Sequence, residues 1–183
     1  MEGATPLPSA ASQAAPAAPT VLQIEASGFG RDGHPVEVGL VQADGQAYCS
    51  LIRPAPGWTH WDPAAERLHH IALATTVAHG RDALDVATQL NERLQGQTVY
   101  CDGWAHDGIW LGMLFEAAGL CPAFRLDNLR VLLTDREAAF WAVLKQQVAS
   151  EMRLQRHRAS ADAKILQRTF MRLRGPLPAR PAA

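Results

Sequence analysis

HRASADAKIL, residues 157–166, is the stretch of the chain that decides the fold. It places His157 five residues before Asp162 in a segment that otherwise has the composition of a helix. In one continuous helix, five residues turn the chain by about 500°, so the two side chains would lie on different faces. They point into one site only if the chain bends between them, and we expect a new helix to begin near Ser160. Taken alone, His157 is better interpreted as a surface residue of an arginine-rich helix.

VLQIEASGFG, residues 21–30, is a short apolar run that breaks at glycine, which predicts a strand over 21–26. Side chains alternate across a sheet, so Val21, Gln23 and Glu25 share one face of this strand. Two polar residues in a buried strand need partners, because leaving them unsatisfied is costly. Either this face is the floor of a polar site, or the strand is an edge strand with one face in water.

CDGWAHDGIWL, residues 101–111, carries Asp102 and Asp107 just after a brief apolar strand, with Asp107 at the start of an amphipathic helix. The carboxyl end of a strand is the usual location of a ligand crevice in an open α/β sheet. Both aspartates also have a structural interpretation. Asp107 would be the N-cap of the helix that follows, and Asp102 a loop residue.

Strands and helices alternate along the chain after residue 19. The expected strands cover 21–26, 35–42, 46–54, 98–101 and 130–133, and the expected helices cover 62–71, 82–94, 107–120, 137–152 and a last segment to about 173. An Asp44-Gly45 turn predicts an antiparallel hairpin between the second and third strands. This order predicts a single α/β domain with a mixed sheet and helices packed on its faces.

The composition fits one globular domain, because 48% of the 183 residues are hydrophobic. The Ala/Pro-rich segments 1–19 and 174–183 are expected to be disordered tails, which leaves 20–173 as the folded domain. No apolar run approaches the roughly 18 residues that cross a bilayer, so no membrane association is expected. The three cysteines form no CxxC pair and their number is odd, which favours a reducing compartment such as the cytoplasm.

Basic residues dominate the C-terminal region. From Arg153 onward Asp162 is the only acidic residue, against eight basic ones: Arg153, Arg156, Arg158, Lys164, Arg168, Arg172, Arg174 and Arg180. A basic stretch beside an acidic site suits a phosphodiester substrate, because Arg and Lys bind phosphates. The alternative is a solvated helix face with no binding role.

Together these segments resemble the DEDDh 3′–5′ exonuclease superfamily, relatives of the proofreading subunit of bacterial replicative DNA polymerase, over roughly residues 20–172. The resemblance implies a ribonuclease-H-like fold, with a mixed sheet flanked by helices. The family has Asp-x-Glu on its first strand, an Asp after a later strand, and a final His-x4-Asp pair. In this chain the corresponding residues are Gln23 and Glu25, then Asp107, then His157 and Asp162.

The resemblance also implies hydrolysis of phosphodiesters with two Mg²⁺ or Mn²⁺ ions, which prefer oxygen ligands. Glu25 and Asp162 would bind the metal on the side of the attacking water, and Asp107 would act largely through water. His157 would be the general base, a role that suits an imidazole at neutral pH.

The substrates implied by the resemblance are 3′ ends of single-stranded DNA or RNA, or short oligonucleotides. Ala26 and Ser27 occupy the positions at which the backbone of the family contacts the 3′-terminal nucleotide. Trp104, beside the second motif, could stack on a base, since base stacking on aromatic rings tolerates any sequence.

Gln23 departs from the family pattern, in which an aspartate at this position binds both metals. Glutamine offers only a neutral carbonyl oxygen, so the second metal would lose most of its affinity and the rate would fall by about 10² or more. Two functions therefore stay open. One is a 3′–5′ exonuclease weakened by Gln23, and the other is a catalytically inactive exonuclease-fold protein that binds nucleic acid ends or a protein partner.

Overall fold

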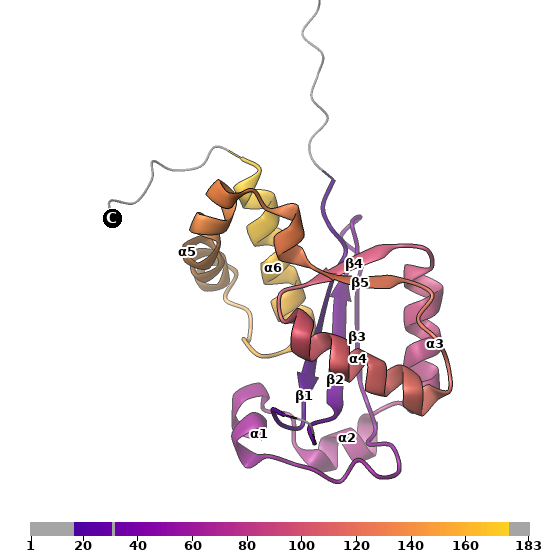
Figure 1. Cartoon of the computed structure of the whole chain (residues 1–183). Coiled ribbons are helices and arrows are strands. Elements are labelled where there is room, and N and C mark those ends of the chain that lie inside the picture. The colour runs from indigo at the N-terminus through magenta and orange to yellow at the C-terminus, as the bar shows by residue number, and fades with distance from the viewer. Residues whose placement is uncertain (1–16, 31, 176–183) are drawn as a thin grey trace, which may run out of the picture.

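The computed structural model describes residues 17–30 and 32–175. Its centre is a five-stranded sheet with the order β3-β2-β1-β4-β5 (Figure 1). The strands are β1 (Val21–Ala26), β2 (Pro35–Val41), β3 (Ala47–Leu51), β4 (Thr98–Cys101) and β5 (Arg125–Asn128). β1 and β3 run antiparallel to β2, whereas β4 runs parallel to β1 and to β5. This mixed sheet in one domain confirms the predicted ribonuclease-H-like α/β fold.

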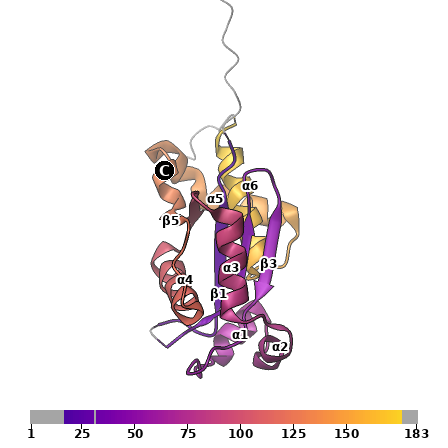
Figure 2. The same ribbon diagram turned by 90° about the vertical axis from the view of Figure 1, so that its right-hand side faces the viewer.

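Helices cover both faces of the sheet. They are α1 (Pro63–His69), α2 (Leu73–His79), α3 (Ala83–Leu94), α4 (Trp104–Ala118), α5 (Asp135–Met152) and α6 (Ala159–Leu173), with a 3-10 turn η1 (Leu129–Leu132). Figures 1 and 2 show α3 and α4 on one face and α5 and α6 on the other. α1 and α2 lie at the end of the sheet where β1 finishes (Figure 1).

The two faces of β1 are used differently, as the alternation predicted. Leu22 and Ile24 pack into the main core with α3 and α4, where Leu90 and Leu114 are fully buried. Val21 belongs to a separate cluster on the α6 side of the sheet. Gln23 and Glu25 are half-buried, as expected for polar residues on that second face. The strand is central, so the edge-strand alternative is wrong.

The expected strand over 130–133 is wrong. The last strand, β5, forms instead at Arg125–Asn128, and most of the expected segment lies in η1. β5 pairs with the whole of β4, so the parallel ladder ends at Asn128. The Asn128 side chain then accepts a hydrogen bond from the backbone N–H of Arg130 and starts a helical turn in place of a longer strand.

The predicted bend before the last helix is present. α5 ends where Arg153 adopts a left-handed backbone with φ of 50°, and His157 adopts the same conformation with φ of 58°. α6 then begins at Ala159, next to the expected start. His157 and Asp162 therefore do not belong to one continuous helix.

The two tails expected to be disordered, 1–19 and 174–183, lie almost entirely outside the described residues. Within the described part of the chain, no helix is both long and apolar enough to cross a membrane.

Candidate active site

A cleft with a volume of about 260 Å³ opens at the carboxyl end of β1. Its walls come from β1, α1, the start of α4 and the segment that leads into α6. Every residue of the three predicted motifs lines it: Gln23, Glu25, Asp107, His157 and Asp162. The fold thus brings together side chains from three distant segments of the chain.

Burial dominates the electrostatics of the carboxyl groups in this cleft. Burial, reinforced by the neighbouring Asp162, raises the pKa of Glu25 to about 8. Burial raises the pKa of Asp107 to about 7 and also raises the pKa of Asp162. Carboxyls that bind protons so readily are also placed to bind another cation, because a cation relieves the same repulsion and desolvation.

Asp107 lies in the first turn of α4 and is almost fully buried. The N-cap position belongs to Gly103, because the helix begins three residues earlier than the predicted start; the capping interpretation of Asp107 is therefore wrong. The Gln23 amide Nε2 donates to Asp107 Oδ2 at 3.3 Å and to the Leu22 carbonyl at 3.0 Å. Gln23 therefore presents N–H groups, and not its carbonyl oxygen, to the neighbouring carboxylate.

His157 and Asp162 are joined through the backbone. The N–H of His157 donates to Asp162 Oδ2 at 3.2 Å, which ties the bend to the first turn of α6. Arg156 Nε lies 3.5 Å from the other oxygen of Asp162. The left-handed backbone of His157 turns the chain so that both side chains line the cleft.

Glu37 on β2 anchors this bend, and the sequence reasoning missed it. The Glu37 side chain is completely buried and accepts hydrogen bonds from Arg158 Nε, at 3.1 Å to each oxygen, and from the Ala159 N–H at 2.8 Å. The Glu37–Arg158 pair therefore fixes Arg158 and Ala159, which lie between His157 and Asp162 in the chain, against the sheet. A glutamate inside the apolar run PVEVGLV was the available signal, because a buried carboxylate requires a cationic partner.

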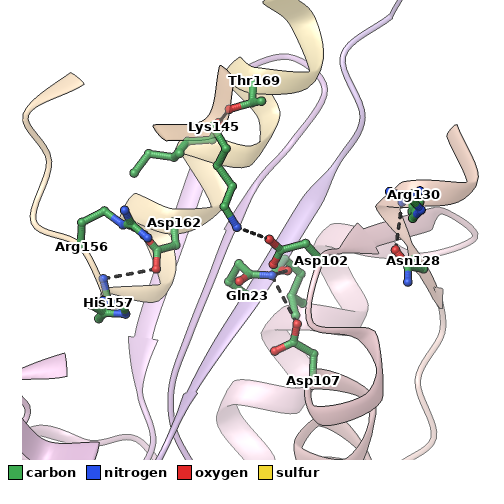
Figure 3. Close-up of polar contacts among 12 residues, drawn as sticks. Gln23, Asp102, Asp107, Asn128, Arg130, Lys145, Arg156, His157, Asp162 and Thr169 are labelled. Atoms are coloured by element: carbon green, nitrogen blue, oxygen red, sulfur yellow. Dashed lines mark hydrogen bonds and ion pairs between the residues drawn. The ribbon is translucent and has the colours of Figure 1, made fainter. Parts of the chain in front are cut away.

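A second, smaller cavity of about 190 Å³ adjoins the cleft and shares three of its residues, Gln23, His157 and Asp162. Asp102 at the end of β4 and Lys145 on α5 complete its polar lining with Arg156. Lys145 Nζ lies 2.6 Å from Asp102 Oδ2, and Figure 3 shows the lysine extending toward the end of β4. No sequence signal pointed to Lys145, which is 43 residues from its partner.

Ala26 lines the cleft as expected, but the structure places Ser27 and Trp104 elsewhere. The Ser27 N–H donates to the His34 carbonyl, its own carbonyl accepts from Asp62, and its side chain is fully buried. Trp104 is half exposed and lines a separate apolar hollow on the outer side of α4. In the described structure neither residue is part of the lining of the cleft.

The C-terminal basic stretch is mostly occupied by ion pairs. Arg158 pairs with Glu37, Arg172 with Glu151, and Arg174 with Glu137. Among the described basic residues from Arg153 onward, only Arg156 lines the cleft or the adjoining cavity. The expectation of a broad phosphate-binding stretch is therefore reduced to this one arginine.

An aromatic wall lines the same cleft as the carboxylates. Phe29, His106 and Trp110 form a cluster with ring centroids 5.7–6.4 Å apart, and Phe29 is 68% exposed. Leu68 from α1 completes this apolar side of the cleft. The cleft therefore combines an acidic floor with a surface on which a flat ring can stack.

The residues present fit one divalent cation better than two. Glu25 and Asp162 act on each other electrostatically and offer the oxygen atoms that Mg²⁺ and Mn²⁺ prefer. Around Gln23 the lining instead presents amide N–H groups and the Lys145 ammonium. Within residues 17–30 and 32–175, no three His, Cys, Asp or Glu side chains lie close enough together to hold a metal ion, so a cation at Glu25 and Asp162 would take its other ligands from water or from a phosphate.

Comparison with solved structures identifies the fold. Escherichia coli exonuclease I, in a zinc-bound complex with single-stranded DNA, matches with a TM-score of 0.65 and 12% identity, over 84% of this chain and 40% of that chain. The same enzyme with a dT13 oligonucleotide matches with a TM-score of 0.63 and 11% identity, over 85% and 41%. Exonuclease I from Methylocaldum szegediense gives 0.62 and 11%, over 85% and 40%.

No protein-family model matches the chain, and no curated protein sequence matches it either. The chain spans only about 40% of the length of the exonuclease I structures, and the identity is low. The likeness therefore shows a shared exonuclease fold, and the chemistry must be argued from the residues of the cleft.

Proposed function

We propose that the protein is a 3′–5′ exonuclease that hydrolyses the terminal phosphodiester of single-stranded DNA or RNA, or of short oligonucleotides, at a rate lowered by Gln23. One observation carries this proposal. Glu25, Asp107, His157 and Asp162, from three distant segments, converge on one cleft at the carboxyl end of β1. Two of the matching exonuclease I structures hold single-stranded oligonucleotides, which supports the same class of substrate.

In the proposed reaction, the His157 imidazole accepts a proton from a water molecule. The water oxygen bonds to the terminal phosphorus, and the bond from phosphorus to the preceding 3′ oxygen breaks. That oxygen takes up a proton, which yields a nucleoside 5′-monophosphate and a strand shortened by one nucleotide. A divalent cation held by Glu25 and Asp162, Mg²⁺ or Mn²⁺, would supply Lewis-acid stabilisation of the developing charge.

The other residues of the cleft orient the reacting groups. The hydrogen bond from its own backbone to Asp162 holds His157 in place, and the Glu37–Arg158 pair holds the bend against β2. Asp107 accepts a hydrogen bond from the Gln23 amide and contacts the substrate through a water molecule. The aromatic wall of Phe29, His106 and Trp110 stacks on the terminal base.

The test follows release of labelled nucleotide from a 3′-labelled single strand with Mg²⁺ or Mn²⁺, for the wild type and for Asp162→Ala and His157→Ala. We expect slow release by the wild type and at least a 100-fold lower rate in each variant, because Asp162→Ala loses a ligand of the cation and His157→Ala loses the general base. A strand blocked at its 3′ end is the control for direction. Equal rates in wild type and Asp162→Ala would contradict the proposal.

The second candidate is an inactive exonuclease-fold protein that binds nucleic acid ends or a protein partner. The direction of the Gln23 amide favours it, because an N–H group beside Asp107 does not replace a metal-binding carboxylate. Retention of the labelled strand by the wild type, with no shortening in either metal, would support this candidate over the first.

A further inference from the structure

Lys145 is the charged group beside the cleft that the proposed function does not use. It extends from α5 into the cavity next to Gln23, with its Nζ 2.6 Å from Asp102 Oδ2 (Figure 3). Its side chain is about one-third exposed, so the ammonium group is accessible to a ligand in this cavity.

The side of the site around Gln23 is unsuited to a second metal ion. Gln23 carries no charge, its N–H groups point toward Asp107 and the Leu22 carbonyl, and Asp102 is already neutralised by Lys145. A divalent cation there would meet an ammonium group of like charge at short range. In a partly buried site this repulsion is screened less than it would be in water.

The same arrangement suits an anion. Lys145 and Arg156 both line the cavity, and both are accessible to solvent. Arg156 shares Asp162 with the proposed cation site, so a cation bound to Asp162 would leave the guanidinium free for another partner. Lys as a point charge and Arg as a planar donor are the side chains that bind phosphate oxygens.

We propose that this cavity is a phosphate-binding site in which Lys145, assisted by Arg156, supplies the positive charge of a second metal ion, so that the protein works with a single divalent cation. The choice of a nucleic acid phosphate as the ligand rests on the proposed function. The expectation of a single bound cation does not depend on the proposed function, because it rests on the geometry of the site alone.

The first test counts bound Mn²⁺ by calorimetric titration of the full chain without substrate. We expect one ion for the wild type, and one for Gln23→Asp, because Lys145 would pair with the new carboxylate. The double variant Gln23→Asp/Lys145→Met, which has the carboxylate and lacks the ammonium, should bind two. A second ion in the wild type, or none gained in the double variant, would overturn the proposal.

The second test measures binding of thymidine 5′-monophosphate and of thymidine, with one equivalent of Mn²⁺ bound. We expect Lys145→Met to weaken binding of the monophosphate about tenfold and to leave thymidine binding unchanged, since one charged hydrogen bond is lost. Lys164→Met, which removes the only other lysine of the chain, is the matched control and should bind like the wild type. Inorganic phosphate should bind more weakly than the nucleotide.

Equal affinity of wild type and Lys145→Met for the monophosphate would overturn the phosphate site. Inorganic phosphate binding as tightly as the nucleotide would overturn the choice of a nucleic acid phosphate as its ligand. Neither test requires hydrolysis, so the exonuclease proposal and the single-cation proposal can be refuted independently of each other. A chain that binds one Mn²⁺ and the nucleotide through Lys145 without shortening a strand would refute the exonuclease proposal only. A chain that shortens strands with two bound ions would refute the single-cation proposal only.

Discussion

Glu37 is a carboxylate with no exposed surface, and Arg158 is its cationic partner at the start of α6. Arg158→Met would leave that charge buried without compensation. We expect the free energy of unfolding to fall by roughly 3 kcal/mol, the usual cost of breaking a buried pair from one side. Urea denaturation followed by circular dichroism measures the change.

The control for this variant is Arg53→Met, which removes the cation of the ion pair with Asp82. Both partners there are about half exposed, so the expected loss is below about 1 kcal/mol. If the two variants were destabilised equally, the Glu37–Arg158 pair would not be the anchor that its geometry indicates.

His34 makes stability depend on pH. Burial, with His60 nearby, lowers the pKa of His34 from its usual 6.5 to about 4, so the folded state holds fewer protons than the unfolded state between these values. The contribution of His34 to stability is therefore complete above about pH 6.5 and is lost as the pH drops toward 4. The full shift corresponds to an upper limit of about 3 kcal/mol.

The comparison protein for this prediction is His34→Asn, whose side-chain oxygen can take the place of Nδ1 beside Ser27 Oγ. Free energies of unfolding at pH 7 and pH 4.5 should show a larger loss in the wild type than in the variant. Parallel losses would mean that His34 does not carry this dependence, which would then belong to other groups.

Residues tied to a motif could be predicted from the sequence, whereas their charged neighbours could not. Glu25, Asp107, His157 and Asp162 lie in one cleft because each follows a strand end or a bend that the pattern indicates. Lys145 sits in the middle of an ordinary helix, and only the packing of α5 against α6 brings it to Asp102. The direction of the Gln23 amide is likewise decided by Leu22 and Asp107 in the folded chain.

Among the elements, α6 packs against β2 at a point where only glycine fits. A Cβ on Gly39 would lie 2.2 Å from the Ser160 nitrogen and 2.4 Å from the Ala159 carbonyl carbon. Gly39→Ala should therefore push the start of α6 away from the sheet, with a loss of about 2 kcal/mol in the free energy of unfolding. Because α6 carries Asp162, nucleotide release should fall as well.

Gly112→Ala in the interior of α4 is the matched control, since a Cβ there meets nothing within 4 Å. We expect it to raise stability by up to about 1 kcal/mol, the difference in helix propensity between the two residues. Thermal melts measure the stability of both variants, and assays on the labelled strand measure their nucleotide release. Unchanged stability and activity in Gly39→Ala would show that α6 tolerates displacement.

Elements with a strong local signal could be predicted, and those that depend on pairing could not. The first two strands and the helix that begins after Asp62 follow from alternation and capping. β5 is four residues long and partly polar, and it is a strand only because β4 offers it a parallel ladder. The apolar run after it was the stronger local pattern, and the Asn128 cap turned that run into η1.

At the scale of the whole molecule, the cleft is small and positive charge near it is scarce. The chain has 17 basic residues and 18 acidic ones, and three of the arginines, Arg53, Arg172 and Arg174, form ion pairs outside the cavities. The matching exonuclease I chains are more than twice as long, so the greater part of each lies beyond the region that this fold covers. Among the described residues, Lys145 and Arg156 are the Lys and Arg side chains that line the two cavities, so a short grip on the end of a strand is the expected mode of binding.

This mode of binding predicts that the affinity for a single strand depends only weakly on salt concentration. Each phosphate neutralised on a single strand contributes about −0.7 to the slope of log K against log [salt], and Lys145 and Arg156 can neutralise two, so the slope should be about −1.4. Fluorescence anisotropy between 50 and about 300 mM KCl, on strands with a phosphorothioate at the last linkage to slow hydrolysis, measures it. Lengthening the strand from about 5 to about 30 nucleotides should not tighten binding, since no other Lys or Arg among the described residues lines the cavity. Lys145→Met should reduce the slope by about 0.7, while Arg172→Gln, on an ion pair away from both cavities, should leave it unchanged. A wild-type slope of about −4 or steeper would mean that a long basic surface elsewhere on the molecule binds the strand.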